Sequence, residues 1–166
     1  MKEGVLPDYK QGNILNLMSS LSSGLGLESA YAPLLELSPR EVNRATNIIL
    51  MVLDGLGYDS MMKLLPSSFL RQHNLLTLQT VFPSTTTAAI TTFITGLSPQ
   101  EHGLIAWYMK MKEFDGKVVA ILPWRTKDKE ALPKRKITLP LSLFQKLSIP
   151  SHIILKKKLQ RIPYNS

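Results

Sequence analysis

The stretch Asn47-Ile-Ile-Leu-Met-Val-Leu53, followed by Asp54-Gly55-Leu56-Gly57, decides the fold of this 166-residue chain. A continuous apolar run of this length, bounded by turn residues, is typical of a parallel strand that is buried on both faces. Asp54 follows the strand directly and therefore stands at its carboxyl end, where open α/β sheets bind ligands. Asp54 is thus a candidate ligand or base, although Asp-Gly is also a common turn dipeptide whose carboxylate bonds its own loop.

Predicted helices lie on both sides of this strand, and a second apolar segment follows it along the chain. Asn13 is a plausible N-cap for a short helix, and Ser38-Pro39-Arg40-Glu41 resembles a capping box that opens another helix running to about Ala45. Asp59 can cap a third helix, and residues 75–82 predict a second strand. Strands interspersed with helices indicate an α/β fold with a largely parallel sheet.

A hydroxyl-rich turn, Ser84-Thr85-Thr86-Thr87, opens the next predicted helix, which ends at Gly96. A threonine at this place can cap the helix. It can also attack a phosphorus atom, because the helix N-terminus and a bound metal would stabilise its alkoxide. Local sequence leaves both roles open.

The remainder of the chain predicts a β-hairpin, a helix and a strand. Asp115-Gly116 is a type I′ turn signal between residues 107–112 and 117–122. Residues 142–147 predict a short helix and residues 152–155 a short strand. The three histidines, His73, His102 and His152, are expected to be structural or exposed rather than metal ligands.

Composition excludes several classes of protein. The chain has no cysteine, so it has no thiolate nucleophile, cysteine-ligated zinc or disulfide. The longest apolar run, residues 48–53, is far short of the ~20 residues of a membrane span, and no signal peptide is visible, so a cytoplasmic protein is expected. The net charge of +8 comes from the last 42 residues, which carry 11 basic and 2 acidic side chains. Their clusters at 134–136 and 156–158 predict a solvated surface, and a nucleic-acid partner is not expected.

Several motifs occur together in a characteristic order. The apolar strand with Asp54-Gly-Leu-Gly57 is followed by Phe82-Pro-Ser-Thr-Thr-Thr87 and then by Thr95-Gly-Leu-Ser-Pro-Gln-Glu-His-Gly103. This order resembles the type I phosphodiesterase/nucleotide pyrophosphatase family of the alkaline phosphatase superfamily. The resemblance implies an alkaline phosphatase-like α/β fold, a mostly parallel sheet flanked by helices.

The resemblance also implies a two-metal esterase, usually with zinc, that hydrolyses small-molecule phosphodiesters or nucleotide pyrophosphates. Counting back from the Thr-Gly-Leu turn, the family's nucleophile falls on Thr86, which would form a phospho-threonine and ligate one metal ion. Asp54 would ligate the same ion. Trp107 stands where the eukaryotic nucleotide pyrophosphatases have a phosphate-binding asparagine, so their nucleotide specificity is not carried over.

The family's remaining metal ligands, an Asp-x-x-x-His pair, an Asp-His pair and a later histidine, have no counterpart in these 166 residues. We therefore expect the N-terminal part of one catalytic domain, cut short: a lead-in (1–46), a core with the nucleophile motif and hairpin (47–124), and a basic segment with prolines (125–166). Such a chain would be inactive or weakly active, and its open sheet edge predicts low solubility or reliance on a partner. The alternative is a non-catalytic remnant or a small binding module that uses the basic segment.

Overall fold

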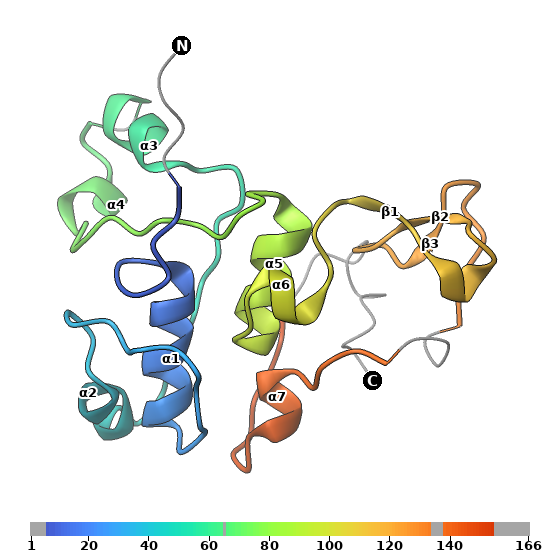
Figure 1. The fold of residues 1–166 in the computed structure, drawn as a ribbon. Helices are drawn as coiled ribbons and strands as arrows, with labels where there is room; N and C mark the ends of the chain where they lie inside the picture. The colour runs from blue at the N-terminus through green and yellow to red at the C-terminus, as the bar shows by residue number, and fades with distance from the viewer. Residues whose placement is uncertain (1–5, 65, 134–137, 155–166) are drawn as a thin grey trace.

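The structure, a computed structural model, describes residues 6–64, 66–133 and 138–154. Helices make up most of the regular structure in these residues, and a small antiparallel sheet lies to one side of them (Figure 1). In chain order the elements are α1 (Ile14–Gly24), α2 (Pro39–Arg44), α3 (Tyr58–Leu64), α4 (Phe69–Gln72), α5 (Thr86–Thr95), α6 (Pro99–His102), β1 (Tyr108–Lys110), the 3₁₀ turn η1 (Lys112–Phe114), β2 (Val118–Ala120), β3 (Arg125–Thr126) and α7 (Leu143–Lys146).

The first two helices begin at capping boxes, which confirms the predictions for their N-termini. Asn13 accepts a hydrogen bond from the backbone of Leu15, and the Asn16 side chain accepts one from the Asn13 N–H. The two helices pack against each other at Gly24, where an added Cβ would lie 2.5 Å from the side chain of Val42. This close approach requires glycine at the end of α1.

Helix α5 lies at the centre of the described chain, between α1 and the hairpin (Figure 1). It spans the predicted residues and ends at Gly96, whose φ of 71° is the left-handed conformation typical of a residue that closes a helix. Its two ends enter two different apolar cores: Ala88 packs with α1, and Ile94 packs with the hairpin. Helix α5 is therefore held by one core near its N-terminus and by the other near its C-terminus.

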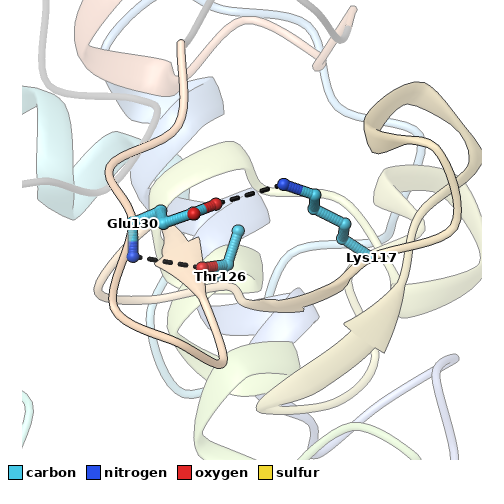
Figure 2. A network of polar contacts seen from close by, with 3 residues as sticks. All are labelled: Lys117, Thr126 and Glu130. Carbon is cyan, nitrogen blue, oxygen red and sulfur yellow. Dashed lines mark hydrogen bonds and ion pairs between the residues drawn. The ribbon is translucent and has the colours of Figure 1, made fainter.

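The predicted hairpin is confirmed as an antiparallel pair, but its strands are shorter than the predicted 107–112 and 117–122, and Lys112–Phe114 form the 3₁₀ turn η1 between them. Strands β1 and β2 pair antiparallel, and Asp115 and Gly116 have φ of 54° and 73°, as a type I′ turn requires. A third strand, β3, extends the sheet beyond β2. Two contacts of Glu130 hold the end of β3, as Figure 2 shows. The Glu130 carboxylate forms an ion pair with Lys117 at 3.1 Å, and the Glu130 N–H donates a hydrogen bond to Thr126 Oγ1 at 3.1 Å.

The predicted parallel strands are not found among the described residues. Residues 47–53 form no strand and make no backbone hydrogen bond to a described residue. Within 75–82, only Gln79 forms a bridge, which is parallel and pairs with Asn13. A parallel strand needs a neighbour brought to it by a crossover of a dozen or more residues. The described part of the chain supplies none for 47–53, so its β-propensity is not realised as pairing.

The C-terminal predictions have mixed outcomes. Helix α7 begins after the N-cap Ser142 as expected, whereas residues 152–154 are not in a strand. Both basic clusters, at 134–136 and 156–158, lie outside the described residues. No described helix has the length and apolar character needed to cross a membrane. The described fold is thus a mixture of helices and a small antiparallel sheet, consistent with part of an α/β domain.

Candidate functional site

Asp54 lies in the turn that follows the extended segment 47–53. Gly55 has a φ of 78° and directs the chain out of this segment, as the Asp-Gly dipeptide predicts. The Asp54 side chain is exposed. Its carboxylate accepts one hydrogen bond from the described residues, and that bond does not come from its own turn.

Thr86 is the donor of that bond. It is the first residue of α5, and its Oγ1 lies 3.4 Å from Asp54 Oδ2 although the two residues are 32 positions apart. The distance is long for a hydroxyl–carboxylate hydrogen bond, which is usually near 2.7 Å. The two residues predicted from sequence as site residues therefore meet in space, in loose contact.

Thr85, not Thr86, is the residue that caps α5. Its Oγ1 accepts a hydrogen bond from the Ala88 N–H at 3.1 Å and donates one to the Ile105 carbonyl at 2.8 Å. The first bond satisfies a free donor of the helix, and the second fixes the cap to the loop after α6. Because the capping role is taken by Thr85, the Thr86 hydroxyl is free for another partner.

The neighbouring Thr87 has a different environment. Its side chain is fully buried, and its Oγ1 has no hydrogen-bond partner among the described residues. The hydroxyl-rich turn thus contains three threonines in three situations: a cap, an accessible hydroxyl that points at a carboxylate, and a buried hydroxyl.

A model of a known protein family matches the part of the chain that contains Asp54 and Thr86. The model of the type I phosphodiesterase/nucleotide pyrophosphatase family matches residues 48–144, more than half of the chain. The chain belongs to this family. No curated protein and no solved structure matches the chain. The matched region includes both Asp54 and Thr86 as well as helices α3 to α6 and the hairpin.

Members of this family are generally metal-dependent, and the site offers two oxygen donors to a metal ion. Asp54 and Thr86 offer a carboxylate and a hydroxyl, which are hard oxygen ligands for a divalent cation. No group of three or more His, Cys, Asp or Glu side chains able to hold a metal occurs in the described ranges. Catalytic zinc sites use three protein ligands. The two donors therefore do not make a complete metal centre.

The histidines contribute no ligand to this pair. His102 is buried at the end of α6, where its Nδ1 accepts a hydrogen bond from the Leu104 N–H at 3.0 Å and its Nε2 lies 3.4 Å from Thr92 Oγ1. Burial lowers the pKa of His102 from 6.5 to about 4, so the ring is neutral at pH 7. His73 stacks on Phe69 at 4.0 Å, and His152 is exposed.

A polar connection that sequence reasoning missed joins the N-terminal region to α6. The Tyr31 hydroxyl donates to Glu101 Oε2 at 2.5 Å, and the same oxygen accepts bonds from the Ser98 N–H and hydroxyl. Burial and then the bond to Glu101 raise the pKa of Tyr31. Burial alone would raise the pKa of Glu101, but the bonds from Tyr31 and Ser98 outweigh it and lower that pKa. The Ser-Pro-x-Glu capping-box pattern at 98–101, the same as at 38–41, is the signal that could have located α6.

Trp107, which the resemblance to the eukaryotic nucleotide pyrophosphatases sets in place of an asparagine, is exposed just before β1. Its indole offers one N–H donor and no amide oxygen, so it does not reproduce the hydrogen bonding of an asparagine.

Proposed function

We propose that this chain carries the nucleophile half of a hydrolase acting on phosphodiester or pyrophosphate bonds, with Thr86 as the nucleophile. The observation that supports this most strongly is the 3.4 Å approach of Thr86 Oγ1 to Asp54 Oδ2 at the N-terminus of α5. Membership of the type I phosphodiesterase/nucleotide pyrophosphatase family supplies the reaction class.

In the proposed step, Thr86 Oγ1 forms a bond to phosphorus as the bond to the leaving oxygen breaks. The hydroxyl proton passes to Asp54 Oδ2, the carboxylate that it faces. The leaving oxygen takes a proton from water when the leaving group is an alcohol, or departs as part of a phosphate, and a second water then hydrolyses the phospho-threonine. Before the step, the Asp54 carboxylate orients the Thr86 hydroxyl. The free N–H groups at the start of α5 can donate to the phosphoryl oxygens, where negative charge develops.

A metal ion in this family would stabilise charge on the attacking and leaving oxygens. Asp54 and Thr86 are the residues of this chain that would contact one ion. We propose zinc as that ion, and we propose that the remaining ligands come from sequence other than these 166 residues. The chain would accordingly be the first part of one alkaline phosphatase-like catalytic domain, with weak cation binding and slow turnover when it is alone.

The test is hydrolysis of bis(p-nitrophenyl) phosphate by the full chain during a zinc titration, with variants of the site. Thr86→Ala should abolish any turnover and any phosphorylated peptide found by mass spectrometry, whereas Thr86→Ser should keep both. Ser84→Ala, at an exposed hydroxyl two residues away, is the matched control and should behave as the wild type.

Two outcomes would contradict the proposal. Turnover that persists in Thr86→Ala would exclude this nucleophile. Fast, zinc-saturable turnover by the isolated chain, lost in Asp54→Asn and Thr86→Ala, would show that the site is complete and that no further ligands are needed.

A further inference from the structure

The chain contains the dipeptide Asp-Gly twice, as Asp54-Gly55 and as Asp115-Gly116. The two copies share their local setting: both glycines have a positive φ, 78° and 73°, and both aspartate side chains are exposed. Glycine has no side chain, so another group can approach its backbone nitrogen closely. An Asp-Gly pair thus lets the glycine nitrogen come close to the carboxyl group of the preceding side chain.

Backbone hydrogen bonding distinguishes the two pairs. The Gly116 N–H donates to the Met111 carbonyl at 3.0 Å. The Asp115 N–H donates to the Lys112 carbonyl at 3.1 Å, so this dipeptide is held within the hairpin turn. The Gly55 N–H, in contrast, donates to no backbone carbonyl of the described residues.

The Asp54 carboxyl group is equally unrestrained. It accepts one hydrogen bond from the described residues, from Thr86 at the long distance of 3.4 Å, and it forms no ion pair with them. Both Asp54 and Gly55 are exposed, so water reaches the dipeptide. The described part of the chain therefore leaves both the carboxyl carbon and the glycine nitrogen free to approach each other.

We propose that Asp54 is a site of spontaneous conversion to isoaspartate through a succinimide, whereas Asp115 is protected while the chain is folded. The Gly55 backbone nitrogen forms a bond to Asp54 Cγ. A carboxyl oxygen leaves as water, with the proton of the Gly55 N–H and one proton from solvent. A second water opens the ring: attack at Cγ restores aspartate, and attack at the Asp54 main-chain carbonyl carbon gives isoaspartate. The proposal does not rest on the hydrolase activity.

The conversion changes the candidate site. In isoaspartate the main chain runs through Cβ and Cγ, which lengthens the backbone by a methylene group, and the free carboxylate is carried on Cα. The carboxylate that faces Thr86 is therefore displaced, whether or not Thr86 acts as a nucleophile. Conversion removes one of the two oxygen donors from the site.

The experiment incubates the full chain at neutral pH in water labelled with heavy oxygen, returns it to ordinary water and digests it with trypsin for mass spectrometry. Each passage through the succinimide leaves a label on the aspartate, whichever product forms. Peptides 45–63 and 113–117 report on Asp54 and Asp115, and fragmentation locates the label and identifies isoaspartate. The label should enter Asp54 about tenfold faster or more, because the Gly116 N–H must first lose its hydrogen bond.

Two controls separate the fold from the neighbouring sequence. In concentrated guanidinium chloride the fold is lost, and both aspartates should take up label at similar rates. Asp54→Glu keeps the negative charge but would have to close a larger ring, so label at this position should disappear. Label at Asp115 should stay unchanged in this variant, which also reports that the hairpin is intact.

Equal rates at Asp54 and Asp115 in the folded chain would overturn the proposal. So would a difference of the same size in guanidinium chloride, because the neighbouring residues would then be its cause. A folded chain in which neither aspartate takes up label, although both do so in guanidinium chloride, would show that Asp54 is protected and would overturn it as well.

Discussion

The buried, neutral His102 predicts how the stability of this chain depends on pH. Its ring nitrogens are bonded inside the protein, and burial lowers its pKa from 6.5 to about 4. The unfolded chain therefore takes up a proton at a higher pH than the folded chain. Stability from this residue is complete above pH 6.5 and is lost as the pH falls from 6.5 toward 4.

The magnitude follows from the difference between the two pKa values. At ~1.4 kcal/mol for each pKa unit, protonation below both values removes about 3 kcal/mol from the free energy of unfolding. The charged group that acts on His102 is Glu101, whose pKa is lowered by the bonds from Tyr31 and Ser98, so it stays ionised through the upper half of this window. The upper half of the window therefore reports on the histidine.

The assay is urea unfolding followed by circular dichroism at a series of pH values through this window, at low protein concentration. His102→Gln keeps a neutral hydrogen-bonding side chain that does not titrate, so its stability should stay flat where the wild type loses stability. His73→Gln, at an exposed histidine, is the matched control and should follow the wild type. Parallel curves for the wild type and His102→Gln would refute the reasoning.

Three further perturbations test the packing and capping. Gly24→Ala places a methyl group 2.5 Å from Val42 and should destabilise the chain by about 1–3 kcal/mol in urea unfolding; an unchanged midpoint would contradict the close approach of α1 and α2. Thr85→Ala removes the α5 cap and should cost about 1 kcal/mol, while Thr85→Ser should restore most of it; equal losses in both would show that the hydroxyl is not the source. Tyr31→Phe removes the short bond to Glu101, so it should cost about 1 kcal/mol and raise the pKa of that carboxyl, as measured by NMR titration; an unmoved pKa would argue against the bond.

The parts of the fold that were predictable from the sequence are those fixed by local chemistry. The caps at Asn13 and Ser38, the left-handed Gly96 and the Asp115-Gly116 turn each depend on residues within four positions of one another. A capping bond or a positive φ is decided locally, so the pattern and the structure agree.

The two predicted parallel strands were not predictable in this way, because a parallel strand is completed by a partner distant in sequence. Residues 47–53 and 75–82 have the composition of buried strands, yet the described chain gives them one bridge, at Gln79. β-propensity reports that a residue fits a paired, half-buried surface, and it does not supply the pair. The link between Tyr31 and Glu101 was missed because it too joins residues far apart in the sequence, 70 positions from each other.

The candidate site combines a residue on a locally capped helix, Thr86, with a residue at the end of an unpaired segment, Asp54. This difference decides which of the two is better positioned. Thr86 is fixed by a buried helix whose cap, Thr85, is itself bonded to the Ile105 carbonyl. Asp54 ends a segment without backbone partners among the described residues, and its contact with Thr86 is its one hydrogen bond to them. Catalytic groups act best when neighbouring contacts hold their geometry. Any strand that pairs with 47–53 would therefore help to fix the position of Asp54 against Thr86, whose hydroxyl lies 3.4 Å from it.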